Sequence, residues 1–135
     1  MRVALTAAIM DVFHDGHRNI LNIMRDNADK VIVVLHDNLS CYRIKNKFPI
    51  QTVEHRKQNV LDTGLVDEVL ITKDIDPSDC FRTVLDTYYD VIFVRGNDNF
   101  EFPGKHTILK YEIPILYVEY TKGISSSIIR LDLTK

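Results

Sequence analysis

Short apolar runs rich in valine and isoleucine recur along the chain and alternate with segments of helical spacing. The runs are continuous rather than alternating, which is typical of strands covered on both faces. They occupy residues 3–10, 31–35, 66–72, 91–94 and 115–118. We therefore predict five short buried strands.

Three segments between these runs have the period of an amphipathic helix: residues 16–26, residues 54–63, and a stretch that begins near residue 76. The last opens with Asp-Pro-Ser-Asp, which supplies cap and first-turn residues. The residues expected to face inward from these helices are Ile20, Leu21, Met24, Val60, Leu61, Phe81, Val84, Leu85 and Tyr88. Residues 37–53 lack such a pattern and are expected to form a long irregular segment, a kind that is often functional.

The alternation of strands and helices implies right-handed crossovers and a parallel sheet. We predict an α/β fold: a single Rossmann-like domain over residues 1–135, with a mainly parallel five-stranded sheet flanked by helices on both faces. In such sheets ligands bind beyond the carboxyl ends of the strands, near the point where the strand order reverses. The segments that follow the strands are therefore where a site is expected.

Composition narrows the class of partner. Lys and Arg number 17 against 19 Asp and Glu, so the molecule as a whole has no field that attracts nucleic acid or an anionic membrane. No apolar run approaches the ~20 residues that cross a bilayer. The two distant cysteines and the missing secretory pattern argue against a disulfide framework. We expect a soluble cytoplasmic protein that binds neither nucleic acid nor membrane, and any anion must be bound by a local cluster.

The sequence His14-Asp15-Gly16-His17 follows the first predicted strand and precedes a helix. Gly16 lets the backbone approach a ligand closely, and the amino end of the helix presents unpaired N–H groups to an anion. Two histidines three residues apart can each donate a hydrogen bond to a phosphate oxygen. Two other readings are surface histidines in a turn, or a metal bound by both rings, although no further ligand has matching spacing.

A second cluster, Thr-Lys-Gly-Ile-Ser-Ser-Ser at residues 121–127, follows the last predicted strand. Glycine, several hydroxyls and a helix amino end would form a second phosphate cradle, with the helix continuing through Ile128 and Ile129. The alternative is a plain serine-capped helix.

Five short motifs follow one another along the chain: His-x-Gly-His, Glu-His-Arg-Lys at 54–57, Val-Asp-Glu-Val at 66–69, Gly-Asn-Asp at 96–98 and Thr-Lys-Gly-Ile-Ser-Ser at 121–126. Together they resemble the cytidylyltransferase family, most closely the glycerol-3-phosphate cytidylyltransferases, over essentially the whole chain. The resemblance implies a nucleotidyltransferase that moves CMP from CTP to a phosphorylated small alcohol, glycerol 3-phosphate being the first candidate, and releases pyrophosphate. Alternatives are an adenylyltransferase using ATP, or a nucleotide-binding homologue with weak or no catalysis.

The resemblance also implies roles for individual residues. His14 and His17 would bind the nucleotide phosphates and stabilise the transition state, helped by Lys45. The implied nucleotide-binding residues are Ala8, Ile9, Met10, Gly16, Asp98, Thr121, Gly123, Ile124, Ser125 and Ser126. Those implied for the acceptor or a phosphate are Asp11, Lys47, Arg56 and Tyr120. Mg²⁺ carried with the nucleotide phosphates, and a homodimer, are implied too, while no metal site is visible in the residues themselves.

The chain departs from the family pattern at three places. Residues 8–11 read Ala-Ile-Met-Asp where the family has Gly-Thr-Phe-Asp, and Gly64 and Tyr120 stand where it has arginines. Two phosphate-facing cations are thus replaced, and Arg43, Arg95 or Lys122 would have to compensate. Arg95, directly after the strand at 91–94, is the best placed of these. The remaining histidines, His36, His55 and His106, are interpreted as surface or packing residues.

Overall fold

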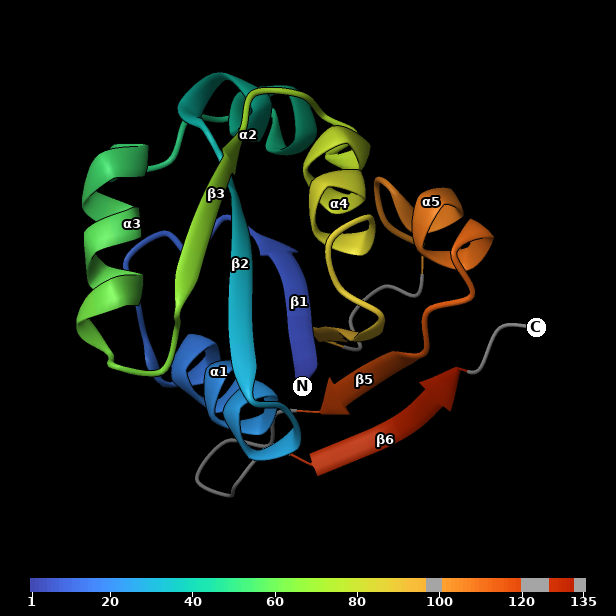
Figure 1. Ribbon diagram of the computed structural model, residues 1–135. Helices are drawn as coiled ribbons and strands as arrows, with labels where there is room; N and C mark the ends of the chain where they lie inside the picture. Colours follow the sequence, from blue (N-terminus) through green and yellow to red (C-terminus); the bar gives the residue numbers. More distant parts are fainter. Residues whose placement is uncertain (97–100, 120–126, 133–135) are drawn as a thin grey trace.

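In the computed structural model, which describes residues 1–96, 101–119 and 127–132, a twisted sheet runs through the molecule with helices on both of its faces (Figure 1). The strands of these described ranges are β1 (Arg2–Ala8), β2 (Lys30–His36), β3 (Glu68–Thr72), β4 (Asp90–Gly96), β5 (Ile115–Glu119) and β6 (Ser127–Asp132). The helices are α1 (Asp15–Asn27), α2 (Asn38–Lys45), α3 (Val53–Asp62), α4 (Ser78–Leu85) and α5 (Lys105–Lys110). None of the described helices is long and apolar enough to cross a membrane.

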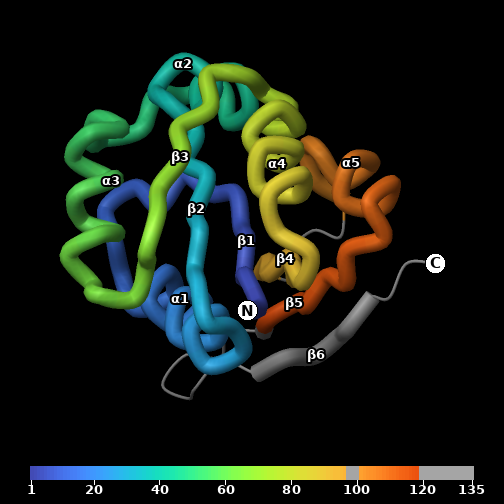
Figure 2. The backbone as a smooth tube through the Cα atoms, viewed as in Figure 1, coloured from blue at the N-terminus to red at the C-terminus, as the bar shows by residue number. Residues whose placement is uncertain are grey.

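The strand order is β3-β2-β1-β4-β5-β6. The first five strands are parallel to their neighbours, and β6 runs antiparallel to β5 at the edge. The predicted mainly parallel α/β sheet is confirmed. Successive strands extend the sheet from β1 towards β3, and the chain then crosses to β4 on the other side of β1, as the tube in Figure 2 traces. The strand order therefore reverses between β1 and β4.

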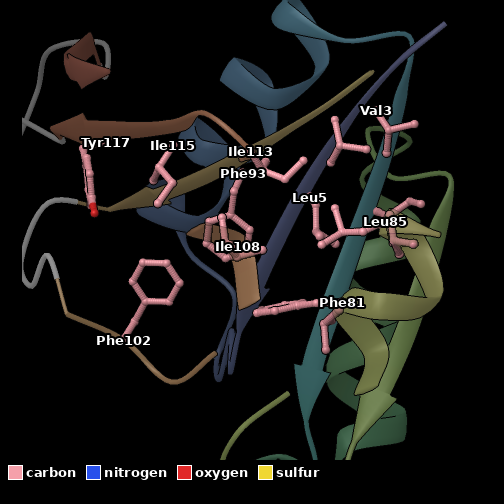
Figure 3. Packing of buried hydrophobic residues seen from close by; sticks show 14 residues of the cluster. Val3, Leu5, Phe81, Leu85, Phe93, Phe102, Ile108, Ile113, Ile115 and Tyr117 are labelled. Carbon is pink, nitrogen blue, oxygen red and sulfur yellow. The ribbon is translucent and has the colours of Figure 1, made fainter. Parts of the chain in front are cut away.

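Strand pleating divides the core into two layers. One layer lies between the sheet and α4 and α5, and takes Val3 and Leu5 from β1 and Phe93 from β4. Phe93 packs edge-on against Phe81 and stacks on Phe102, with ring centroids 5.3 and 5.0 Å apart (Figure 3). The other layer takes the alternate strand residues, such as Ala4, together with residues of α1 and α3.

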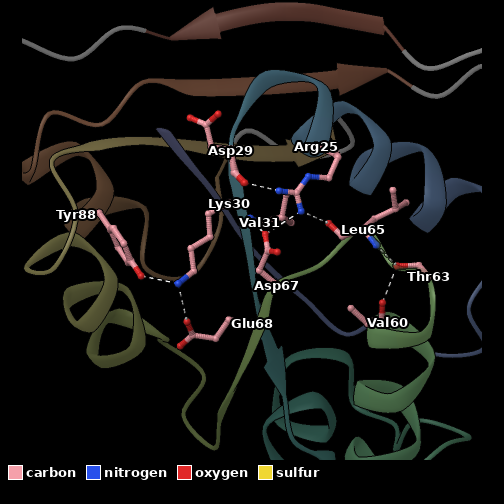
Figure 4. Close-up of polar contacts among 10 residues, drawn as sticks. All are labelled: Arg25, Asp29, Lys30, Val31, Val60, Thr63, Leu65, Asp67, Glu68 and Tyr88. Carbon is pink, nitrogen blue, oxygen red and sulfur yellow. Dashed lines mark hydrogen bonds and ion pairs between the residues drawn. The ribbon is translucent and has the colours of Figure 1, made fainter. Parts of the chain in front are cut away.

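The amino edge of the sheet is held by polar contacts (Figure 4). Asp67 accepts hydrogen bonds at 2.8 Å both from Arg25 of α1 and from the backbone N–H of Val31. Lys30 contacts the Tyr88 hydroxyl at 2.6 Å and Glu68 at 3.6 Å. The acidic pair of the Val-Asp-Glu-Val motif therefore joins α1, β2 and β3.

Three features differ from the prediction. Strand β1 ends at Ala8 because Met10 has φ +50°, which no strand accommodates. The supposedly irregular segment contains α2, which Asp37 caps by accepting a hydrogen bond from the N–H of Ser40 at 2.8 Å. The short helix α5 was not foreseen either.

The helix predicted through Ile128 and Ile129 is wrong. Residues Ser127–Asp132 form β6, which pairs with β5. β-branched residues favour extended backbone, and the free edge of β5 offers hydrogen bonds to a returning strand. Tertiary pairing has therefore outweighed the local helix-capping pattern.

Candidate active site

A pocket of about 320 Å³ opens at the carboxyl edge of the sheet, where the strand order reverses. The ends of β1 and β4 form its floor, and α1 and α2 contribute walls. The Thr6 hydroxyl joins these two strands by donating a hydrogen bond to the carbonyl of Val94 at 2.6 Å. The lining residues are Thr6, Ala7, Ala8, Ile9, Met10, His17, Ile20, His36, Ile44, Lys45, Arg95, Gly96 and Pro103.

The charged groups of this lining all have one sign. Lys45, at the end of α2, and Arg95, at the end of β4, are permanent cations, and two histidines accompany them. Among the described residues, no aspartate or glutamate lines the pocket. A concave site whose described charged side chains are all basic favours an anionic ligand.

The two histidines of the first motif are fixed by the start of α1. His14 is the N-cap, and its Nδ1 accepts a hydrogen bond from the N–H of Gly16 at 3.0 Å. The Nδ1 of His17 in turn accepts from the N–H of His14 at 3.2 Å, and the rings stack with centroids 3.8 Å apart. Because both Nδ1 atoms accept, each neutral ring carries its proton on Nε2. Two Nε2–H groups, both beside a helix amino terminus, can therefore donate hydrogen bonds to a ligand.

The ring of His17 is neutral at pH 7. Burial, with the nearby His14 ring, lowers the pKa of His17 to about 4, and the opposing charge of Asp11 is too weak to restore it. At neutral pH the ring therefore offers a hydrogen bond without a positive charge. The other basic side chains of the pocket lining are those of Lys45 and Arg95.

The segment between β1 and α1 has an uncommon backbone. Met10 and Val12 have φ +50° and +47°, in a region where side chains other than glycine are strained. The carboxylate of Asp11 accepts hydrogen bonds from the N–H groups of Ile50 and Gln51 at 2.8 and 3.0 Å. Although partial burial raises the pKa of Asp11, those two hydrogen bonds and the charge of Arg56 outweigh it and hold the pKa below its usual value.

Arg56 is fully buried at the carboxyl edge of the sheet. Its guanidinium donates to the carbonyls of Ile9 and His36, each at 2.8 Å, and to the side chain of Asn38 at 2.9 Å. A fourth contact reaches the carbonyl of Gln51 at 3.2 Å. Arg56 therefore joins the ends of β1 and β2 to the start of α2, and in this structure it is positioned to shape the pocket rather than to line it.

The structure brings together part of the predicted site. The predicted residues that line the pocket are Ala8, Ile9, Met10, His17 and Lys45. His14 and Gly16 stand next to it at the start of α1, whereas Lys47 is exposed and Asp11 is bound to the loop before α3. Predicted residues outside the described ranges are Asp98, Tyr120, Thr121, Gly123, Ile124, Ser125 and Ser126.

Sequence reasoning missed several lining residues. His36, interpreted as a surface or packing residue, is buried and lines the pocket, and Arg95 was named only as a substitute cation. Their signal in the sequence is their place, each at the end of a strand flanking β1. The other unforeseen lining residues are Thr6, Ala7, Ile20, Ile44, Gly96 and Pro103.

Magnesium was implied by the family resemblance. Within the described residues, no group of three or more His, Cys, Asp or Glu side chains is placed to hold a metal ion.

Comparison with known proteins identifies the family. A model of the family described as cytidylyltransferase-like matches residues 5–131. The chain belongs to the cytidylyltransferase-like family. It is therefore a nucleotidyltransferase, and the pocket lies where enzymes of this fold bind their ligands.

The chain is also similar to individual proteins. The chain is 31% identical to the glycerol-3-phosphate cytidylyltransferase of Bacillus spizizenii, and 28% identical to that of Bacillus subtilis, over 98% of both chains in each case. It is also 29% identical to the bifunctional protein HldE of Helicobacter hepaticus, over 93% of this chain and 25% of that protein. Among solved structures, the lipopolysaccharide core biosynthesis protein of Thermoplasma volcanium has the same fold, with a TM-score of 0.68, 22% identity, and coverage of 92% of this chain and 99% of that one.

Gly64, where the family resemblance leads one to expect an arginine, lies at the opposite edge of the sheet from this pocket. It follows the end of α3, with its N–H donating to the carbonyl of Leu61 at 3.1 Å, near the amino edge of the sheet. Its φ of +72° is a conformation that glycine adopts readily.

Proposed function

We propose that this nucleotidyltransferase transfers CMP from CTP to a phosphorylated small alcohol, with glycerol 3-phosphate as the first candidate. An oxygen of the acceptor phosphate forms a bond to the α-phosphorus of CTP. The bond from that phosphorus to the oxygen bridging the α- and β-phosphates breaks, and pyrophosphate leaves with the electron pair. The products are a CDP-alcohol and pyrophosphate.

The observation that carries this proposal is the pocket at the strand-order reversal, whose described charged lining residues are cations. Two polyanions must meet there, so the main tasks are positioning and charge stabilisation. The second pKa of a phosphate monoester is about 6, so the acceptor is largely dianionic at neutral pH and needs no general base. The Nε2–H groups of His14 and His17 would hydrogen-bond the phosphoryl oxygens, while Lys45 would offset their charge.

The predicted contacts that lie outside the described residues belong to the same proposal. Gly96 at the end of β4 pairs with Val118, and Glu119 at the end of β5 pairs with Ser127 at the start of β6. The described flanks of residues 97–100 and 120–126 therefore lie at the pocket's edge of the sheet. This supports nucleotide contacts from Asp98, Thr121, Gly123, Ile124, Ser125 and Ser126, and an acceptor contact from Tyr120.

The remaining expectations follow from family membership. Enzymes of this family typically use Mg²⁺, and we propose that the ion arrives on the phosphates of the nucleotide. We further propose a cytoplasmic homodimer. Equilibrium sedimentation over a range of protein concentrations tests the dimer, and a single monomeric species throughout would contradict it.

The deciding experiment measures pyrophosphate release with Mg²⁺, with CTP and ATP compared across a panel of phosphorylated alcohols. We expect release that requires CTP together with an acceptor, and a CDP-alcohol as the second product. A preference for ATP would indicate an adenylyltransferase. Nucleotide binding without product for any acceptor would indicate a homologue that has lost catalysis.

A further inference from the structure

Three strand ends place side chains on one face of the carboxyl edge. In β1, β2 and β4, the residues that pack towards α4 and α5 include Leu5, Val34 and Phe93. Two positions further along each strand, the same alternation places Ala7, His36 and Arg95 on this face. All three line the pocket, and β1 lies between the other two strands. Ala7 is small, so space remains above it between His36 and Arg95.

Arg95 is held by an aromatic stack. Its guanidinium carbon lies 4.5 Å from the centroid of the Phe102 ring, and Phe102 stacks on Phe93 with an angle of 1° between the rings. Figure 3 labels both rings among the residues of this core layer. A guanidinium held on an aromatic ring loses less freedom on binding, and its planar fork suits a phosphate.

His36 contributes an unused polar atom. The side chain is buried, with 6% of the residue exposed, and its Nδ1 has no hydrogen-bond partner within the described part of the chain. Burial lowers the pKa of His36, against the effect of a hydrogen bond to the Asp74 backbone, so the ring is neutral at pH 7. Because Nδ1 has no partner, the hydrogen bond to Asp74 is assigned to Nε2, and Nδ1 of the neutral ring then retains its lone pair. A buried acceptor without a donor is costly and calls for a ligand that supplies one.

We propose that Arg95 and His36 form the acceptor subsite, in which Arg95 binds the phosphate of the phosphorylated alcohol and His36 Nδ1 accepts a hydrogen bond from one of its free hydroxyls. This inference rests on the proposed function. It places the acceptor, the second substrate of that reaction, at the carboxyl edge on the face of the sheet that carries α4 and α5. The nucleotide phosphates take the opposite side, where α1 presents His17. Two anions are thus bound by separate cations, and the subsite selects a polyol phosphate over a simple alkyl phosphate.

The first test compares Arg95→Met with Arg95→Lys, and with Arg82→Met as the control. Arg82 is an exposed arginine of α4 that pairs with Asp79. We expect Arg95→Met to raise KM for glycerol 3-phosphate about 10- to 100-fold, while KM for CTP changes by less than about threefold. Arg95→Lys keeps the charge but loses the fork, so its effect is smaller, and Arg82→Met has none. An equal or larger rise in KM for CTP overturns the assignment.

The second test pairs His36→Leu with propyl phosphate, which has the phosphate of glycerol 3-phosphate but neither free hydroxyl. In the wild type, we expect kcat/KM for propyl phosphate to be at least about tenfold below that for glycerol 3-phosphate. In His36→Leu this ratio should approach one, whereas His36→Asn, which keeps a polar acceptor, should retain part of it. Because each ratio is taken within one protein, a general loss of activity does not affect it. Equal discrimination by wild type and His36→Leu contradicts the role of His36.

Calorimetric titrations of the same proteins separate the two proposals. Wild-type protein that binds glycerol 3-phosphate about tenfold or more tightly than Arg95→Met supports the subsite, even where no product forms, and an absence of product then counts only against the proposed function. If the wild type turns over CTP but Arg95→Met binds glycerol 3-phosphate as tightly as the wild type does, the result counts only against the subsite. Wild-type protein that binds no glycerol 3-phosphate also overturns the subsite.

Discussion

The two edges of the sheet use their charged side chains in different ways. At the amino edge cations meet carboxylates: Arg25 pairs with Asp67 at 2.8 Å, and Arg2 pairs with Asp90 at 3.2 Å. At the carboxyl edge Lys45 and Arg95 line a pocket to which the described part of the chain contributes no carboxylate. The first arrangement pairs charges within the fold, and the second gathers basic side chains around a cavity that suits an anionic ligand. Substitutions at the amino edge should therefore change stability, and those in the pocket should change kinetics.

Arg56 is the exception to this contrast between the edges, and its replacement should have the largest effect on stability. It lies at the carboxyl edge, yet its guanidinium donates hydrogen bonds to groups within the fold. We expect Arg56→Met to lower the free energy of unfolding by about 3–5 kcal/mol, since three carbonyls, one of them buried, lose a charged hydrogen-bond donor. Urea denaturation measures the change. Lys57→Met, the next residue of α3, is the control and should cost under about 1 kcal/mol. A loss that small for Arg56→Met would show that its hydrogen bonds do not support the pocket.

Replacement of His14 should affect turnover rather than folding. Asparagine is a good N-cap, so His14→Asn keeps the start of α1 while removing the ring donor. We expect kcat to fall about 10²- to 10³-fold, with a thermal midpoint within a few degrees of the wild type. His17→Ala should lose turnover to a similar degree, and the exposed His55→Asn should not. Near-normal rates in both His14→Asn and His17→Ala would exclude the proposed role of the motif.

Lys45 tests the use of positive charge at the carboxyl edge. Lys45→Met removes a charged contact worth about 1.5–3 kcal/mol, so KM for CTP should rise about 10- to 100-fold. Lys110→Met, an exposed lysine of α5, provides the matched control. Steady-state kinetics at saturating acceptor measures the effect, and an unchanged KM for CTP would separate Lys45 from the nucleotide.

The lowered pKa of His17 makes stability depend on pH. The folded state keeps this ring neutral down to about pH 4, whereas in the unfolded chain it takes up a proton near pH 6.5. Acidification through this window therefore favours the unfolded chain, by at most about 1.4 kcal/mol per pH unit from this histidine. The stability of wild type minus that of His17→Ala, measured by denaturation from pH 7 to pH 4, should decrease as the pH falls. A flat difference would mean that His17 titrates normally in the fold.

Arg25 should give the smallest effect and sharpen the contrast between the edges. Its ion pair with Asp67 is partly exposed, with 29% and 42% of the two side chains accessible. Arg25→Met should lower the free energy of unfolding by about 1 kcal/mol, and kcat and KM should stay within about twofold of the wild type. Denaturation and kinetics on the same preparation test both, and a large change in KM would show that the two edges are coupled.

The sequence predicts the central strands because their burial on both faces leaves continuous apolar runs. It does not reveal α2, since Ser40 and Cys41 are the buried residues of that helix and give no apolar stripe. Strand β6 depends on pairing with β5, which no local pattern contains. In the site, the motif around His17 is local and was found, whereas the placement of His36 and Arg95 depends on the alternation and alignment of three strands.

The backbone at Gly64 restricts how the sequence can change. A Cβ there would meet no atom within 4 Å, so a larger residue is disfavoured by its backbone torsion and not by crowding. With φ at +72°, such a side chain would carry a conformational cost of about 1–2 kcal/mol. A second change that remodels the end of α3 would relieve this cost. Replacement of this glycine in a single mutational step is therefore disfavoured.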